Sequence, residues 1–271
     1  MYRKVFASKV FERKVIVVTG GCSGIGRALV LRFAQAGARP VILDLHSEEL
    51  DSLVLHLSEH LNSDAIGRVC DVSDPQAVDR VIQEVTEQCG GIDLLINNAG
   101  IAHHSPFIDT PRAVFERVMA VNYFGALSCT QAALPSLLAR QGQIIVLSSL
   151  SGFVPLYLRC AYNASKHALH GLFDTLRQEV RDAGVNVLLV CPGFTATDLH
   201  RNALTGEDQP TPLRTIGRVA RPQDIAETIF HAALRRRTQL VISNVGWRGQ
   251  LLARGFPRLF QRLLLARRPV G

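Results

Sequence analysis

The sequence has few of the features that mark secreted, metal-binding or membrane-spanning proteins. Its six cysteines include no CxxC pair and do not join histidines at the spacing of a metal site. No stretch reaches the roughly 18 apolar residues of a spanning helix, and the basic start MYRKVFASKVFERK lacks the apolar run of a signal peptide. We therefore expect reduced thiols, no bound metal and a cytoplasmic protein.

Acidic residues are absent after Glu227, whereas nine arginines follow it. The net charge of +7 therefore comes from this tail, and residues 1–227 carry a slightly negative balance. No basic patch on the body of the protein accompanies the tail, so we do not expect nucleic acid binding.

Residues 244–271 have the pattern of a basic amphipathic helix. Four apolar residues follow Pro257 at helical spacing, with arginines beside them, and these are Leu259, Phe260, Leu263 and Leu264. Such a helix is typical of peripheral binding at a membrane surface, here the inner one. The same pattern fits packing on a partner subunit, covering of a substrate cleft, or a loose segment.

The length of 271 residues and the hydrophobic content of 47% suit one α/β domain. We place this domain at residues 13–243, after a basic extension of residues 1–12. It begins with the β-branched run KVIVVT, then GGCSGIG, then a helical pattern. Glycines between a strand and a helix let the backbone approach a pyrophosphate, which the helix N-terminus stabilises. Thr19 and Ser23 can fix the turn or a phosphate oxygen, and the alternative is a merely structural turn.

The next strand, PVILD, ends at Asp44, eighteen residues after Gly26. A carboxylate at this place accepts both hydroxyls of an adenosine ribose and repels a 2′-phosphate. No cation beside it, at Ser23 or Leu45, reverses that preference, so we expect NAD rather than NADP. Alternatively, Asp44 only caps the helix that begins near Ser47.

Two further strands end in polar residues. One runs into Asp71 and Val72, which are placed for the adenine amino group and ring face, and Ser73 or Asp74 then caps a helix. The other, GIDLLINNAG, runs into the segment 97–100. Strand and helix alternate throughout, which predicts parallel pairing with right-handed crossovers and a ligand at the carboxyl ends of the strands.

Tyr162 and Lys166 lie four residues apart in a helical pattern, so they share one face. A lysine cation beside a tyrosine favours the phenolate and lowers its pKa from about 10. The pair then serves as a proton donor or acceptor for a substrate oxygen, and Ser149, at the end of the strand QIIVLSS, can hold the same oxygen. In isolation, a Tyr/Lys pair at this spacing is more often a surface pair.

Together these motifs resemble the short-chain dehydrogenase/reductase family. The resemblance runs from about residue 13 to residue 243 and is carried, in order, by TGGCSGIG at 19–26, Asp44, DV at 71–72, NNAG at 97–100, Asn122 in VNYFG, Ser149, YNASK at 162–166 and CPG at 191–193.

The resemblance implies a Rossmann-type, doubly wound, seven-stranded parallel sheet of order 3-2-1-4-5-6-7 in a single domain. It implies Tyr162 as the acid/base, Ser149 as the group that positions the substrate oxygen, and Lys166 as the residue that binds the nicotinamide ribose and lowers the tyrosine pKa.

The resemblance assigns to Asn122 the support of a water in the proton relay. Asn122 lies in a long helical pattern from Pro111 to Arg140, where a polar side chain in an apolar stretch needs a partner, so we expect a distorted helix there. The resemblance also implies a homodimer or homotetramer, with the helices that carry Asn122 and Tyr162 as the usual dimer interface.

The resemblance also assigns residues to the nicotinamide cofactor, and the segment 192–197 is the part expected to hold the carboxamide. Thr195 stands where relatives often have Ile or Val. The cofactor residues are Thr19, Gly20, Ser23, Gly24, Ile25, Gly26, Asp44, Asp71, Val72, Asn98, Ala99, Gly100, Tyr162, Lys166, Pro192, Gly193, Thr195 and Thr197.

The loop before Tyr162 is mostly apolar and predicts a hydrophobic substrate. Ser149, Phe153, Val154 and Tyr157 are expected to line the pocket, although ordinary core packing is the alternative. His103 is expected at its edge; it and His104 are adjacent and point apart, so they suit no metal, and they also fit a solvated loop. Polar residues 194–218 predict a mobile substrate lid.

These features predict hydride transfer between a nicotinamide and a secondary alcohol or ketone, hydrophobic or lipid-like. The chain most resembles the 11β-hydroxysteroid dehydrogenase-like and 3-ketodihydrosphingosine reductase-like branches. The alternatives are an NADPH-dependent ketone reductase of lipid synthesis, and a membrane-associated cofactor-sensing or scaffold protein with vestigial catalysis.

Overall fold

A computed structural model describes residues 10–193, 195, 203–204, 219–242, 252, 255–256, 258–260 and 262. The expected basic extension, the substrate lid and the basic tail fall almost wholly outside the described residues. Those three assignments, and the domain boundaries built on them, stay predictions.

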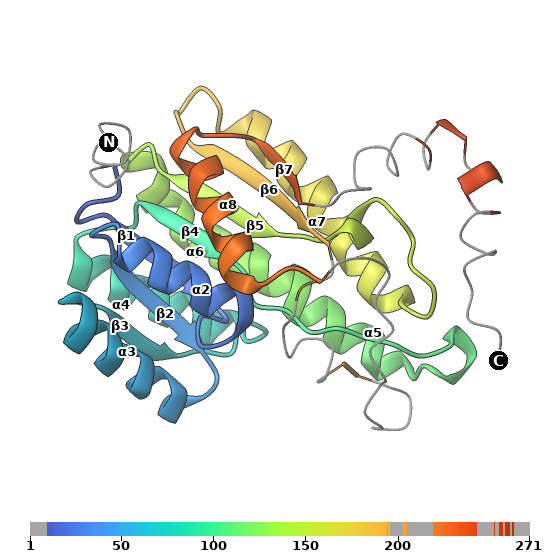
Figure 1. The fold of residues 1–271 in the computed structure, drawn as a ribbon, viewed down its shortest axis with the longest axis horizontal. Coiled ribbons are helices and arrows are strands. Elements are labelled where there is room, and N and C mark those ends of the chain that lie inside the picture. The colour runs from blue at the N-terminus through green and yellow to red at the C-terminus, as the bar shows by residue number, and fades with distance from the viewer. Residues whose placement is uncertain are drawn as a thin grey trace.

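Seven parallel strands form one sheet in the order β3-β2-β1-β4-β5-β6-β7. The predicted strand order and direction are therefore confirmed (Figure 1). The strands are β1 (Val15–Thr19), β2 (Arg39–Asp44), β3 (Ile66–Val69), β4 (Leu94–Asn97), β5 (Gln143–Leu147), β6 (Asn186–Pro192) and β7 (Gln239–Ile242). Their residues are almost all apolar and mostly fully buried, as strands covered on both faces require.

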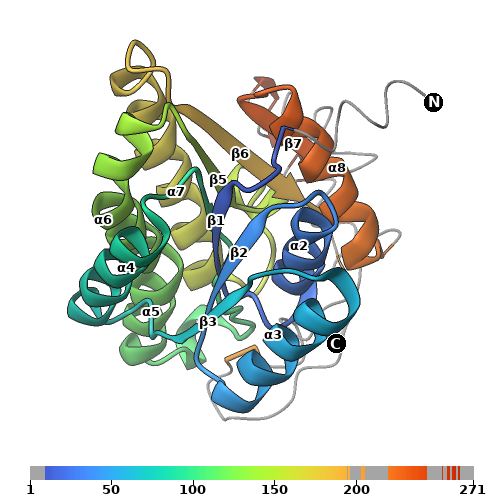
Figure 2. The same cartoon turned by 90° about the vertical axis from the view of Figure 1, so that its left-hand side faces the viewer.

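Helices cover both faces of the sheet, which makes the fold doubly wound (Figure 2). On one face lie α2 (Gly24–Ala34), α3 (Ser47–Leu61) and α8 (Pro222–Leu234). On the other lie α4 (Pro75–Cys89), α6 (Gly125–Ala139) and α7 (Cys160–Glu179), with α5 (Arg112–Met119) at their end. Short 3-10 turns are η1 (Phe107–Asp109) and η3 (Leu150–Gly152).

Each face has its own apolar core. Phe33 of α2 lies at the centre of the first, with Phe11 at 4.9 Å and Phe230 of α8 at 5.2 Å between ring centroids. Phe173 of α7 and Cys129 of α6 are fully buried in the second. All six cysteines are free, and four of them are buried, as expected of reduced thiols. Among the described helices, none is both long enough and apolar enough to cross a membrane.

The long helix predicted around Asn122 contains the distortion that a buried polar residue in an apolar stretch suggests. A π turn, η2 (Ala120–Phe124), separates α5 from α6 and carries Asn122, whose side chain is 1% exposed. Single π turns of this kind occur often at functional sites. The turn brings Asn122 to the sheet edge where β4 and β5 end.

Candidate active site

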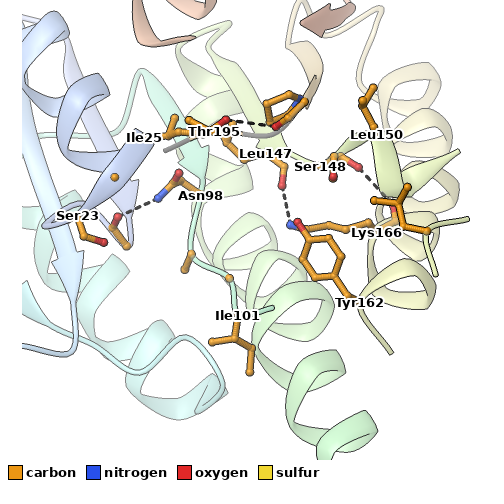
Figure 3. A pocket seen from close by; sticks show the side chains of 18 of the residues that line it. Ser23, Ile25, Asn98, Ile101, Leu147, Ser148, Leu150, Tyr162, Lys166 and Thr195 are labelled. Atoms are coloured by element: carbon orange, nitrogen blue, oxygen red, sulfur yellow. Dashed lines mark hydrogen bonds between the residues drawn. The ribbon is translucent and has the colours of Figure 1, made fainter. Parts of the chain in front are cut away.

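The carboxyl ends of β1, β4, β5 and β6 surround a cavity of about 300 Å³ (Figure 3). One wall is the glycine turn after β1, and the opposite wall is the start of α7. The lining residues are Gly20, Ser23, Gly24, Ile25, Asn98, Ala99, Gly100, Ile101, Leu147, Ser148, Ser149, Leu150, Val154, Leu156, Tyr162, Lys166, Pro192, Gly193 and Thr195. Lys166 is the one charged side chain among these described residues.

A cluster of hydrogen bonds holds the glycine turn against the end of β4. The Thr19 hydroxyl oxygen accepts bonds from the backbone N–H groups of Asn98 and Ala99, both at 3.0 Å. The Asn98 amide donates to the carbonyls of Thr19 at 2.9 Å and Gly20 at 2.8 Å. A Cβ at Gly26 would meet the Gly20 carbonyl and the Asn98 amide, so glycine is required there.

Asp44, at the end of β2, turns its carboxylate toward the glycine turn. It accepts hydrogen bonds from the N–H of Cys22 at 2.9 Å and of Leu45 at 2.8 Å. The N-cap of α3 is His46, so Asp44 does not cap that helix. The Asp44 carboxylate therefore lies next to the glycine turn, and Asp44 is not among the described residues that line the cavity.

Asp71 and Val72 follow β3 near the same edge. Asp71 accepts bonds from the backbone N–H and the hydroxyl of Ser73, at 2.8 and 2.7 Å. Val72 is 7% exposed and packs on Gly125. Asp74, one of the two predicted caps, caps α4 through Gln76. Neither Asp71 nor Val72 is among the described residues that line the cavity, so their predicted contacts with the adenine stay a prediction.

Asn122 ties the π turn to two neighbouring segments. Its side-chain oxygen accepts a bond from the Ile101 N–H at 2.8 Å, and its amide nitrogen donates to the Ile101 carbonyl and the Ser165 hydroxyl, both at 3.0 Å. Ile101 directly follows NNAG, and Ser165 precedes Lys166. The side chain therefore fixes the cavity floor relative to α7.

Ser149, Tyr162 and Lys166 converge on the cavity, as predicted (Figure 3). Ser149 and Tyr162 line the same part of the cavity, and the Ser149 oxygen accepts a bond from the Ser151 N–H at 3.1 Å. The Lys166 ammonium nitrogen donates to the Leu147 carbonyl at 2.8 Å and lies 5.7 Å from the centroid of the Tyr162 ring. Tyr162 and Lys166 are 5% and 4% exposed, so they do not form a surface pair.

Burial shifts the pKa values of both members of the pair. Burial raises the pKa of Tyr162, and the Ser149 side chain and then the charge of Arg159 oppose that rise. Burial lowers the pKa of Lys166 to about 8. Arg159 is thus a cation that favours the phenolate, and the effect of Lys166 on the Tyr162 pKa stays a prediction.

The predicted substrate pocket is right in part. Ser149 and Val154 line the cavity. Phe153 is instead buried with its ring edge toward His170, and Tyr157 is 57% exposed outside the lining. His103 is fully buried and bonded to Ser105 at 2.9 Å, neither a solvated loop residue nor a pocket edge.

Sequence reasoning missed three apolar lining residues, Ile101, Leu147 and Leu150. Ile101 could have been predicted, because it directly follows NNAG, and the strand before NNAG was expected to end at the ligand-binding edge of the sheet. Pro192, Gly193 and Thr195 line the cavity as expected, whereas Thr197 lies outside the described residues.

Comparisons with known proteins agree with this geometry. The family model described as short chain dehydrogenase matches residues 14–208. Dehydrogenase/reductase SDR family member 7B of Xenopus tropicalis is 36% identical over 253 residues, covering 90% of this chain and 82% of that protein. Dehydrogenase/reductase SDR family protein 7-like of Anopheles gambiae is 37% identical over 241 residues, covering 86% and 75%.

Solved structures show the same fold. A short chain dehydrogenase/reductase from Burkholderia phymatum in complex with NAD has a TM-score of 0.78 and 27% identity, covering 96% of this chain and 98% of that chain. An alcohol dehydrogenase from Thermococcus sibiricus complexed with 5-hydroxy-NADP has a TM-score of 0.75 and 24% identity, covering 84% and 95%.

The buried Lys166 predicts a pH-dependent contribution to stability. Its pKa falls from 10.5 in the unfolded chain to about 8 in the cofactor-free fold, so between these values the unfolded chain holds a proton that the folded chain has lost. The free energy of unfolding of the wild type, relative to Lys166→Met, should therefore rise as the pH rises from 8 to 10.5, by at most about 3 kcal/mol.

Urea unfolding of both proteins without cofactor, at half-unit steps of pH from 7 to 10.5, measures this difference. The comparison with Lys166→Met cancels the titration of other groups. A difference that stays constant over this range would contradict the lowered pKa.

Proposed function

The chain belongs to the short-chain dehydrogenase/reductase family, and on that premise we propose that it is an NAD-dependent enzyme that acts on a hydrophobic, lipid-like secondary alcohol or ketone. The observation that carries this proposal is that Ser149, Tyr162 and Lys166 lie together on the wall of a cavity whose opposite wall is a glycine turn. One wall suits a proton transfer, and the other suits a dinucleotide.

The residues of the glycine turn suit a nicotinamide cofactor. Glycine is required at Gly26 because a side chain would meet the Gly20 carbonyl, and the start of α2 offers free N–H groups to a pyrophosphate. Asn98, Ala99 and Gly100 line the middle of the cavity, and Pro192, Gly193 and Thr195 line its far side. When bound, the nicotinamide supplies the hydride acceptor or donor.

Tyr162 is the acid/base of the proposed mechanism. In alcohol oxidation its phenolate takes the proton of the substrate hydroxyl, and in the reverse direction its hydroxyl returns it. Ser149 holds the same oxygen by a second hydrogen bond, and Arg159 favours the phenolate. Lys166 lies where it can hold the nicotinamide ribose hydroxyls, and Asn122 fixes the floor on which a relay water would sit.

Asp44 supports NAD over NADP. Its carboxylate is fixed beside the glycine turn by the Cys22 N–H, and Leu45 follows it, so no cation at that position offsets the repulsion of a 2′-phosphate. The two similar solved structures hold NAD in one case and 5-hydroxy-NADP in the other. The rival within the enzyme class is thus an NADPH-dependent ketone reductase of lipid synthesis.

The lining near Tyr162 supports a hydrophobic substrate. Ile101, Leu150, Val154 and Leu156 present apolar side chains there, and no Asp or Glu is among the described lining residues. An alcohol with an aliphatic body would bury that body against them, with its hydroxyl at Tyr162.

We further propose that the protein is cytoplasmic and that it assembles as a homodimer or homotetramer. Its tail would contact the inner surface of a membrane. Phe124 and Leu138 on the α6 side are 52% and 38% exposed, which supports a subunit interface there. The basic arginines beyond Glu227 support the membrane contact.

Tyr162→Phe tests the proposed function. The substitution removes only the hydroxyl, so we expect turnover to fall by at least about 10³-fold, while the Kd for NAD stays within about twofold. Turnover is read at the nicotinamide absorbance with long-chain alcohols, sterols and polyols as substrates. Residual turnover near the wild-type rate would overturn the role of Tyr162, and reaction of small polyols alone would overturn the lipid-like substrate.

Asp44→Asn tests the cofactor preference. The amide keeps the size of the side chain but removes its charge, so the preference for NAD over NADP, measured as the ratio of Kd values, should shrink by about tenfold or more. Glu48→Gln, an exposed acidic residue in the first turn of α3, is the matched control and should leave the ratio unchanged. Equal affinities for both cofactors in the wild type would favour the NADPH-dependent alternative.

A further inference from the structure

Ser148, the residue before the proposed catalytic Ser149, is held from helix α7. Its hydroxyl lies 3.4 Å from the Lys166 carbonyl and 3.0 Å from Nε2 of His170 (Figure 3 shows the first bond). The bond to Nε2 of His170 is the shorter of the two, and which atom donates in it depends on the tautomer of the imidazole.

The same ring contacts the strand that ends at the nicotinamide side of the cavity. The thiol sulfur of Cys191 lies 3.6 Å from Nε2 of His170, and Cys191 directly precedes Pro192 and Gly193, which line the cavity. Cys191 is fully buried, and burial raises its pKa to about 12. It therefore stays a neutral thiol, and it meets the histidine through a weak hydrogen bond without nucleophilic chemistry.

The turn η3, which follows Ser149, packs on the other side of His170. A Cβ at Gly152 would meet Nε2 of His170 and the Ser148 hydroxyl, so glycine is needed for this approach. The Phe153 ring stands edge-on to the imidazole, with centroids 6.2 Å apart. His170 thus contacts the residue before Ser149, the turn after it and the end of β6.

We propose that His170 is a positioning residue that sets the place of the Ser149 hydroxyl relative to Tyr162, through its hydrogen bond to Ser148 and its packing against Gly152. The proposal rests on the proposed role of Ser149 and Tyr162, and it assigns to the histidine a part in that reaction without contact to substrate or cofactor. His170 lies one turn after Lys166 on α7, so the helix that carries the acid/base also fixes the serine.

His170→Leu tests the proposal, with His170→Gln as the variant that restores a hydrogen-bonding group near the position of Nε2. Loss of this part-buried hydrogen bond is expected to lower kcat about tenfold, and the glutamine is expected to recover it to within about threefold of the wild type. His167→Leu is the control, because His167 lies on the same helix but is exposed and bonds to the Asn163 carbonyl of that helix.

The kcat of each variant is compared in the wild-type protein and in Ser149→Ala. In Ser149→Ala, His170→Leu should change kcat by less than about twofold, because its effect passes through Ser149. An equal loss in both backgrounds, or wild-type kcat in His170→Leu, would overturn the proposal. Urea unfolding shows whether each variant is folded.

A crystal structure of His170→Leu separates this proposal from the proposed function. We expect the Ser149 hydroxyl to move from its wild-type place in the cavity lining beside Tyr162, whether or not a substrate has been found. A Ser149 side chain that keeps its wild-type place would overturn the role of His170. Absence of turnover in the wild type with every alcohol would instead count against the proposed function.

Discussion

The burial of the Lys166 ammonium beneath the cavity is the constraint on which the rest of the site depends. The ammonium nitrogen is buried, and among the described residues it donates a hydrogen bond to the Leu147 carbonyl at 2.8 Å. Removing a cation from water without a carboxylate partner is costly, and the low pKa of about 8 reports that cost. Leu147 is the last residue of β5, and the next two residues, Ser148 and Ser149, line the same cavity.

Two hydrogen-bond clusters keep the cavity open around this buried charge. Thr19 and Asn98 join the glycine turn to the end of β4, and Asn122 joins the segment after β4 to α7. Both clusters bond backbone groups that the ends of parallel strands leave unpaired. The π turn at Asn122 is the local distortion that lets one helix residue reach two segments at once.

The sequence predicted the backbone of the site well, because periodicity, glycine spacing and the order of motifs are local properties. The sheet order, the π distortion at Asn122 and the convergence of Ser149, Tyr162 and Lys166 all follow the predictions. The side chains of the loop before α7 follow the prediction only in part, since Val154 lines the cavity whereas Phe153 and Tyr157 are not among its lining residues. An apolar loop sequence does not show which of its residues face a cavity, because tertiary packing decides that.

Tertiary packing also explains why the sequence did not predict Arg159 and His170 as parts of the site. Arg159 was visible only as a charge in an apolar loop, and its effect on Tyr162 depends on how the start of α7 is folded. His170 reads as an ordinary polar residue of a helix. Its contacts with Ser148 and Cys191 join β5 and β6 across the sheet edge, and residues 22 and 21 positions apart carry no local signal.

A crystal structure with bound NAD and a long-chain alcohol that is turned over slowly tests the central claim most directly. The account predicts the nicotinamide in the cavity between Gly193 and Tyr162, with the substrate hydroxyl within hydrogen-bond distance of both Tyr162 and Ser149. It also predicts a ribose hydroxyl within hydrogen-bond distance of the Lys166 ammonium. A nicotinamide bound elsewhere, or a substrate hydroxyl that contacts neither Tyr162 nor Ser149, would contradict it.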